Sequence, residues 1–169
     1  MRLLERATYV ALIALSCLSA GILIRNQLLA PGASRNAGIP LLQGRSIILS
    51  DVTWERAPHS VVLVLSARCH WCKESVPLYQ EVSALHKAAK GAFQLIAVST
   101  GTAGELLEFL NANLIEVDRI FPAEAANLGV RATPTVLLVN RQGRVVSSWQ
   151  GAMRPSDESA FLEILRKSP

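Results

Sequence analysis

Apolar and polar positions from Arg45 onward form blocks that have the lengths of strands and helices. Two continuous apolar runs, at 60–66 and 92–100, predict strands that are covered on both faces. Two further apolar stretches joined by NRQG predict a hairpin within 133–152. Apolar residues recur at helical spacing in three segments, 70–89, 103–113 and 155–168.

Weaker patterns complete the series of elements. Residues 45–52 are a strand candidate that could form a hairpin with residues 52–54, and 114–118 is a second short strand candidate. A short helix is expected at 122–129, and Ser156 is the expected N-cap of the last helix. Strands that alternate with helices and end in a hairpin and a helix predict an α/β domain with a mixed central sheet.

The N-terminal part of the chain has a different pattern. Residues 7–24 are 18 residues without a charge, flanked by Arg6 and Arg25. As a helix this run would extend about 27 Å, which is enough to cross a bilayer core. We therefore expect a membrane anchor at 1–24. A cleaved signal peptide is the alternative, because the residues around Ala30 are small enough for a signal peptidase.

The segment that follows the predicted span contains prolines and glycines that interrupt any periodicity. We expect 25–44 to be a flexible linker and 45–169 to be the folded domain. The short basic N-terminus favours a cytoplasmic N-tail, which places the domain on the extracytoplasmic side. The expected location is a bacterial inner membrane, crossed once, with the domain facing the periplasm.

Charge argues against a nucleic-acid partner. The formal net charge of the chain is +4, but four arginines and one glutamate in residues 1–44 account for +3 of it. The predicted domain is thus almost neutral, and its charges of both signs are interspersed. It lacks the basic surface that DNA or RNA binding requires.

The stretch SARCHWCKESVP contains Cys69 and Cys72, whereas Cys17 is an apolar residue of the predicted span. Structural zinc needs four ligands, and the chain offers one cysteine pair with scattered histidines. Covalent haem attachment needs a histidine where Lys73 stands. A structural disulfide closing so short a loop would constrain the unfolded chain little. These residues favour a dithiol that takes part in chemistry.

Position supports that interpretation. Cys69 follows a predicted strand directly, and Cys72 falls in the first turn of a predicted helix, where free N–H groups stabilise a thiolate. Cys69 is the candidate exposed nucleophile, and Cys72 is the candidate resolving thiol. Arg68 and His70 are candidates for lowering the pKa of Cys69, although His70 could equally point to solvent.

At these residues the chain resembles the thioredoxin superfamily. The Cys-x-x-Cys follows a strand, Pro77 lies five residues after Cys72, and GVRATPTVLLVNRQGRV is similar to the family's cis-proline segment. With the predicted anchor, the resemblance is closest to the membrane-tethered TlpA/ResA-like branch and covers roughly residues 45–167. It implies a thioredoxin-like fold preceded by one transmembrane helix.

The resemblance also implies roles for individual residues. Cys69 would attack a substrate disulfide and Cys72 would resolve the mixed disulfide. Pro134 would be the cis residue packed against the pair, and the backbone of Thr133 would hold the substrate in an extended pose. Trp71 is a candidate substrate platform.

The chain departs from the branch at several positions. Arg68 stands where tryptophan is usual, and Ser75 stands where a glutamate often assists proton transfer. His70 and Trp71 replace an inner dipeptide in which proline is common. The role of the missing glutamate is therefore not transferred to this chain.

Two functions follow from the resemblance and the residues. The first is a membrane-tethered thiol–disulfide oxidoreductase that acts as a reductant in cytochrome c maturation or copper-site assembly. Its partners would be protein dithiols or disulfides and an upstream membrane electron donor, with no metal and no cofactor besides the Cys69–Cys72 disulfide. The alternative is a carrier that binds Cu(I) through Cys69, His70 and Cys72. Met1 and Met153 are the only methionines, which argues against a copper carrier.

Overall fold

The computed structural model describes residues 42–122 and 128–167. The predicted anchor and most of the predicted linker lie outside the described residues, as does most of the helix expected at 122–129. Within the described ranges, no helix is both long enough and apolar enough to span a bilayer.

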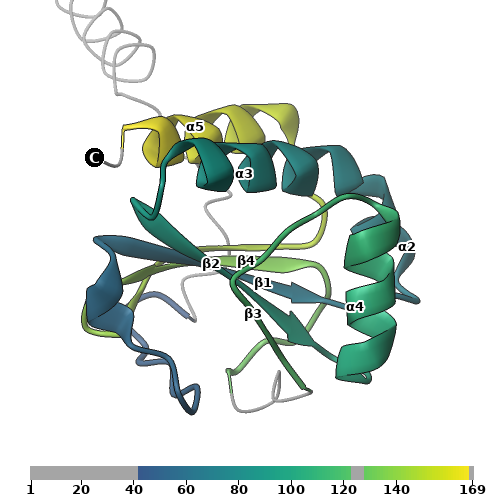
Figure 1. Cartoon of the computed structure of the whole chain (residues 1–169), viewed down its shortest axis with the longest axis horizontal. Helices are drawn as coiled ribbons and strands as arrows, with labels where there is room; N and C mark the ends of the chain where they lie inside the picture. Colours follow the sequence, from purple (N-terminus) through teal and green to yellow (C-terminus); the bar gives the residue numbers. More distant parts are fainter. Residues whose placement is uncertain (1–41, 123–127, 168–169) are drawn as a thin grey trace, which may run out of the picture. The chain divides into compact units, whose positions relative to one another are not determined.

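A five-stranded mixed sheet forms the centre of the domain (Figure 1). The strands follow the spatial order β3-β2-β1-β4-β5. β1 runs parallel to β2, and β2 runs parallel to β3, whereas β4 is antiparallel to both β1 and β5. The strands are β1 (His59–Leu65), β2 (Phe93–Ser99), β3 (Arg119–Phe121), β4 (Thr135–Asn140) and β5 (Val145–Gln150). The predicted α/β architecture with a mixed sheet is confirmed.

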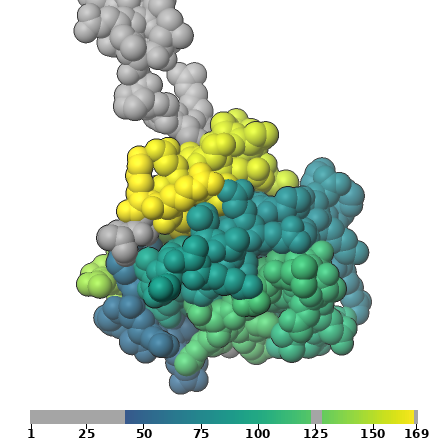
Figure 2. Space-filling view, turned by 45° about the horizontal axis from the view of Figure 1, so that its top comes forward, coloured from purple at the N-terminus to yellow at the C-terminus, as the bar shows by residue number. Residues whose placement is uncertain are grey.

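Helices cover the sheet and complete the layers. They are the 3-10 helix η1 (Trp54–Arg56), α2 (His70–Glu74), α3 (Val76–Ala88), α4 (Ala103–Ala112) and α5 (Pro155–Arg166). α3 and α5 lie side by side over one face of the sheet (Figures 1 and 2). Leu42, Ile47 and Leu49 pack on the opposite face, where they meet Val62 and Val64 of β1. Both faces of β1 are therefore buried, which explains its uninterrupted apolar sequence.

The segment predicted as one helix, 70–89, forms two helices. α2 ends at Glu74, and Ser75 leaves the helical conformation with φ −85° and ψ 4° before α3 begins. Pro77 lies in the first turn of α3, where a missing N–H costs nothing. Inside one continuous helix, the proline ring would clash with the carbonyl group of residue 73. The break at Ser75 avoids that clash.

The predicted strand at 45–52 and its hairpin with residues 52–54 are wrong. Ser46 makes only an isolated bridge to Arg144, and Ile47 N–H donates to the carbonyl of Gly143. The chain then turns at Asp51, which has φ 65°, and continues into η1 rather than into a second strand. Ile47 and Leu49 of this segment cover the sheet from the side opposite α3, whereas Ile48 is exposed.

The strand predicted at 114–118 is also misplaced, because β3 begins only at Arg119. Leu114 turns the chain at φ 56°, and Ile115 fills the core. Asp118 then accepts a hydrogen bond from Leu95 N–H through its side chain. Residues 114–118 therefore form a turn and attach it to the core and to β2, and strand pairing starts only at Arg119.

The start of α5 and the start of the domain differ from the predictions as well. Arg154, not Ser156, is the N-cap of α5, because Pro155 takes the first helical position that suits proline. Leu42 is buried in the core, and Gly44 N–H donates to the carbonyl of Val145. The end of the predicted linker is thus packed on the domain, ahead of the boundary expected at Arg45.

Candidate active site

The Cys-x-x-Cys pair lies where β1 gives way to α2. Cys69 is the N-cap residue of α2, with extended backbone angles of φ −78° and ψ 124°. Its N–H donates to the carbonyl of Ser66 over 3.1 Å, which fixes the short loop between the strand and the helix. The Cys69 thiol is partly exposed, whereas Cys72, one turn further along, is completely buried.

The surroundings of Cys69 favour its thiolate. Partial burial opposes ionisation, but hydrogen bonds from the side chain of Thr133, from Cys72 and from the backbone of Trp71 outweigh that effect. The pKa of Cys69 therefore lies below its ordinary value. The predicted direction of the shift is the same, and the N–H groups of the first helical turn contribute to it as expected.

Cys72 has the opposite character. Burial raises the pKa of the Cys72 thiol to about 12, and the neighbouring charge of Cys69 acts in the same direction. Because Cys69 ionises first, a reagent or substrate in solution meets a thiolate at Cys69 and a protonated thiol at Cys72.

The cis-proline loop lies against the exposed thiol. The Thr133–Pro134 peptide bond is cis, as the sequence resemblance implied, and Pro134 is buried. In its protonated form, Cys69 donates to the carbonyl oxygen of Thr133 over 3.2 Å. Gly151 N–H donates to the carbonyl of Pro134, so the loop is tied to the strand that follows the hairpin turn. The structure thus brings together Cys69, Cys72, Thr133 and Pro134, which are 61 or more residues apart across the two segments.

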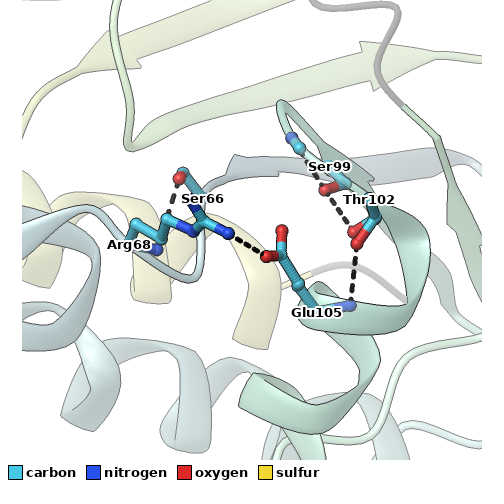
Figure 3. Close-up of polar contacts among 6 residues, drawn as sticks. Ser66, Arg68, Ser99, Thr102 and Glu105 are labelled. Atoms are coloured by element: carbon cyan, nitrogen blue, oxygen red, sulfur yellow. Dashed lines mark hydrogen bonds and ion pairs between the residues drawn. The ribbon is translucent and has the colours of Figure 1, made fainter.

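Arg68 and His70 make their polar contacts elsewhere. The guanidinium of Arg68 forms an ion pair with Glu105 of α4, and the two side chains point toward one another in Figure 3. This hydrogen bond from Arg68 lowers the pKa of Glu105. His70 Nε2 lies 3.4 Å from the carboxylate of Glu74. Arg68 is therefore paired with Glu105 and the His70 ring lies beside Glu74, whereas the pKa of Cys69 is lowered by other groups.

Trp71 remains available to a partner. Its side chain is 54% exposed, and its ring meets His70 edge-on, with ring centroids 5.2 Å apart. A large apolar ring left in water beside the reactive thiol fits the role of a substrate platform.

Glu105 was not identified from the sequence as a site residue. Thr102 Oγ1 accepts a hydrogen bond from Glu105 N–H at the start of α4. The spacing of Thr102 and Glu105 is a helix-start signature, but it carries no information about a partner 37 residues away.

Two buried polar residues near Cys72, Ser75 and Tyr79, also have no role that follows from the sequence. Ser75 is buried at the break between α2 and α3, in the position of the branch's glutamate. Tyr79 is fully buried in the same core cluster as Cys72. Burial raises the pKa of Tyr79, and its hydroxyl makes no hydrogen bond within the described part of the chain. The neighbourhood of Cys72 therefore contains hydroxyl groups at the position where the branch has a carboxylate.

The alternative use of the cysteine pair is to bind a metal ion. Among residues 42–122 and 128–167, no group of three or more histidine, cysteine or acidic side chains is arranged to hold a metal ion. Cys69, His70 and Cys72 do not form such a group, because the His70 ring is directed to Glu74.

No family model and no curated protein matches the sequence. Solved structures do match. A Chlorobium tepidum protein assigned as a thiol:disulfide interchange protein DsbE is 27% identical, with a TM-score of 0.55 over 68% of this chain and 82% of that one.

Two further structures are similar in fold at lower identity. A thiol-disulfide isomerase from Corynebacterium glutamicum is 20% identical, with a TM-score of 0.55 over 79% of this chain and 99% of that one. A secreted disulfide oxidoreductase of Mycobacterium tuberculosis, homologous to E. coli DsbE, is 16% identical, with a TM-score of 0.51 over 73% of this chain and 84% of that one. With the Cys-x-x-Cys pair beside a cis-proline loop, these findings agree with the sequence resemblance. The chain therefore has a thioredoxin-like fold, and the solved structures that it resembles are thiol–disulfide oxidoreductases, in agreement with the TlpA/ResA-like resemblance.

Proposed function

We propose that Cys69 is the attacking thiol and Cys72 the resolving thiol of a redox-active pair that reduces disulfides in partner proteins. The observation that carries this proposal is the difference between the two thiols. Cys69 is partly exposed and has a lowered pKa, whereas Cys72 is buried and has a pKa of about 12. An exposed, ionised thiol can attack the disulfide of a substrate. A buried, protonated thiol does not attack the substrate, and it reacts only after the mixed disulfide has formed.

The reaction proceeds by two exchanges. The Cys69 thiolate attacks one sulfur of the substrate disulfide, a bond forms between the two proteins, and the other substrate sulfur leaves as a thiolate. Cys72 then loses its proton and attacks Cys69 Sγ. The intermolecular bond breaks, and the second substrate sulfur leaves. The substrate gains two electrons, the proton that Cys72 releases and one proton from solvent, and the Cys69–Cys72 disulfide remains for an upstream donor to reduce.

The cis-proline loop supplies the surface for the substrate chain. Thr133 borders a cleft of about 350 Å³ together with Val130 and Arg131. Its backbone carbonyl lies beside Cys69, which suits an extended substrate segment that pairs with the loop and presents its disulfide to the thiolate. Trp71 would cover the other side of that segment.

The proposal also includes the cellular location of the protein and the source of its electrons. The apolar run at 7–24 would hold the chain in a bacterial inner membrane with the domain in the periplasm, and a membrane electron donor would re-reduce it. The secreted location of the Mycobacterium tuberculosis oxidoreductase supports work outside the cytoplasm. The Chlorobium tepidum protein is assigned as a thiol:disulfide interchange protein, which supports disulfide exchange as the activity. Reduction of apocytochrome c or of copper-site cysteines is the task that we propose for it in this chain.

Exchange by the full-length reduced chain tests the function. We expect it to reduce a disulfide-bonded peptide that carries the Cys-x-x-Cys-His motif of apocytochrome c. Cys69→Ser should abolish the reduction. A chain that leaves the peptide oxidised while reducing a copper-site peptide would place the protein in copper-site assembly instead. Failure on every disulfide would overturn the proposed activity.

Fractionation tests the anchor. The chain should stay in the membrane fraction after salt and carbonate washing, and protease added from the periplasmic side should digest the domain. A soluble mature protein that begins near Pro31 would instead show that the apolar run is a cleaved signal peptide.

A further inference from the structure

A polar cleft of about 370 Å³ is lined by Arg68, the residue directly before Cys69, and it adjoins the cleft of the cis-proline loop. Its walls come from the loop after β1, from the loop after β2 and from the start of α4. Arg68 and Glu105 face each other in this cleft, and Ser66, Ser99 and Thr102 provide hydroxyl groups around them (Figure 3). None of these side chains takes part in the exchange between the two thiols.

Glu105 is held in place by its own loop and helix. Its N–H donates to Thr102 Oγ1 over 3.2 Å, and Ser99 Oγ donates to the carbonyl of Thr102 over 2.8 Å. Gly101 leaves room for the carboxylate, because a Cβ there would lie only 3.1 Å from Glu105 Oε2. The backbone of Glu105 is therefore fixed at the start of α4, and its carboxylate extends from there toward Arg68.

Arg68 is the accessible member. Its side chain is 85% exposed, against 38% for Glu105. A guanidinium carries five N–H donors, so contact with Glu105 leaves most of them in water. An exposed ion pair of this kind contributes little stability and is easily rearranged. A second carboxylate could therefore bind Arg68 alongside Glu105 or in place of it.

The hydroxyl groups around Arg68 favour the same kind of ligand. Ser66 Oγ accepts from Arg68 N–H, and Thr102 Oγ1 accepts from Glu105 N–H. Because both oxygens act as acceptors in these bonds, their O–H groups remain able to donate. A cleft that offers O–H and guanidinium donors suits an anionic acceptor.

The cleft lies on the path of a substrate chain. Thr100 borders both this cleft and the cleft of the cis-proline loop, so the two meet at one residue. Cys69 follows Arg68 directly and contacts Thr133 of the other cleft. A substrate whose cysteine reaches Cys69 from the cis-proline loop thus has neighbouring residues within reach of Arg68.

We propose that this cleft is a specificity subsite in which Arg68 binds an acidic side chain close to the reactive cysteine of the substrate. Glu105 holds the guanidinium in position and competes with the substrate carboxylate. This inference rests on the proposed function, since it names the substrates that the same thiol pair would prefer.

The test uses the full-length reduced chain and a series of disulfide-bonded peptides that differ only in having glutamate, glutamine or lysine beside the cysteine. The readout is the ratio of kcat/KM for the glutamate peptide to that for the glutamine peptide. We expect a ratio on the order of five, the factor that one exposed ionic contact supplies, and we expect it to fall as salt is added.

Two variants are expected to change the ratio of kcat/KM values in opposite directions. Arg68→Gln should bring the ratio close to one. Glu105→Gln should raise the ratio, because it removes the competing carboxylate while keeping the shape of the side chain. Lys87→Gln breaks another exposed ion pair, the one with Glu116, and should leave the ratio unchanged.

The outcomes separate this inference from the proposed function. Equal rates for the three peptides would overturn the subsite but not the exchange activity. A preference for the lysine peptide that Glu105→Gln removes would also overturn it, in favour of a cation subsite. Failure to reduce any of the peptides would overturn the proposed function and the subsite together.

Discussion

The sulfur of Cys69 lies 3.2 Å from the backbone carbonyl oxygen of Thr133, although 63 residues separate them in the chain. Cys69 is the N-cap of α2, and Thr133 forms the cis peptide bond with Pro134 just before β4. The contact ties the nucleophile to the loop that would receive the substrate. A side-chain hydrogen bond from Thr133 is also among the causes that lower the pKa of Cys69.

The first prediction compares Thr133 with Arg68 as sources of the lowered pKa. Thr133→Val keeps the side-chain shape but removes the hydroxyl that stabilises the thiolate, so the pKa of Cys69 should rise by about one unit. Arg68→Ala should change it little, because the guanidinium is bonded to Glu105. Titration of thiolate absorbance measures both. An Arg68→Ala shift as large as that of Thr133→Val would restore the role that the sequence suggested for Arg68.

The second prediction concerns stability at high pH. The pKa of Cys72 is raised from 9.0 to about 12 in the folded, reduced protein. Between these values the unfolded chain releases a proton that the folded chain retains, so the stability of the reduced protein should fall as pH rises from 9 to 12. One proton corresponds to a slope of at most about 1.4 kcal/mol per pH unit.

Below pH 9 the stability of the reduced protein should change with pH in the opposite direction. The pKa of Cys69 is lowered in the folded protein, so in this range the unfolded chain holds a proton that the folded chain has released. The stability of the reduced protein should therefore rise toward that pH. Urea unfolding at a series of pH values measures both limbs. The raised pKa of Tyr79 acts in the same direction as Cys72 at high pH, so a Cys72→Ala variant serves as the control. The account fails if that variant keeps the full alkaline slope.

The third prediction tests how the segment before β1 packs on the hairpin. Gly143 has φ 70°, and a Cβ there would lie 2.9 Å from the Trp54 ring and 3.4 Å from the carbonyl of Ile47. Gly143→Ala should lower the free energy of unfolding by about 1–2 kcal/mol, from the left-handed backbone and the displaced ring.

Gly104 provides the matched control for this substitution. It lies in the first turn of α4, and a Cβ there would meet nothing within 4 Å. Gly104→Ala should leave stability unchanged or raise it by up to about 1 kcal/mol, because alanine favours helix. Equal effects of the two substitutions in urea unfolding would show that the contact of Trp54 with the hairpin turn contributes nothing.

The parts of the fold that could be predicted from sequence are those whose pattern reflects local burial. β1 and β2 are buried on both faces, so continuous apolar runs mark them. The β4–β5 hairpin follows from its turn residues, with Gly143 at positive φ. In contrast, residues 45–52 have a strand-like pattern but pair with the turn before β5 through a single bridge, and only the tertiary structure determines that.

In the candidate site, too, some residues could be predicted from the sequence and others could not. Cys69, Cys72 and Pro134 were identified because their spacing follows a family pattern, and the structure places them together. The partner of Arg68 could not be identified, since Glu105 approaches it only because α4 follows the neighbouring strand β2. A charged residue next to a cysteine in sequence indicates proximity along the chain, but it does not fix where a long side chain makes its ion pair.

The most direct test of the central claim is to trap the mixed disulfide in cells that express the full-length chain. Cys72→Ser removes the resolving thiol, so Cys69 should remain covalently attached to partner proteins, visible as thiol-sensitive adducts on non-reducing gels. With Cys17 replaced by alanine in both variants, Cys69→Ser leaves only the buried, protonated thiol of Cys72 and should trap none. Equal trapping by the two variants, or adducts with Cys69→Ser alone, would contradict the assignment of Cys69 as nucleophile and Cys72 as resolving thiol.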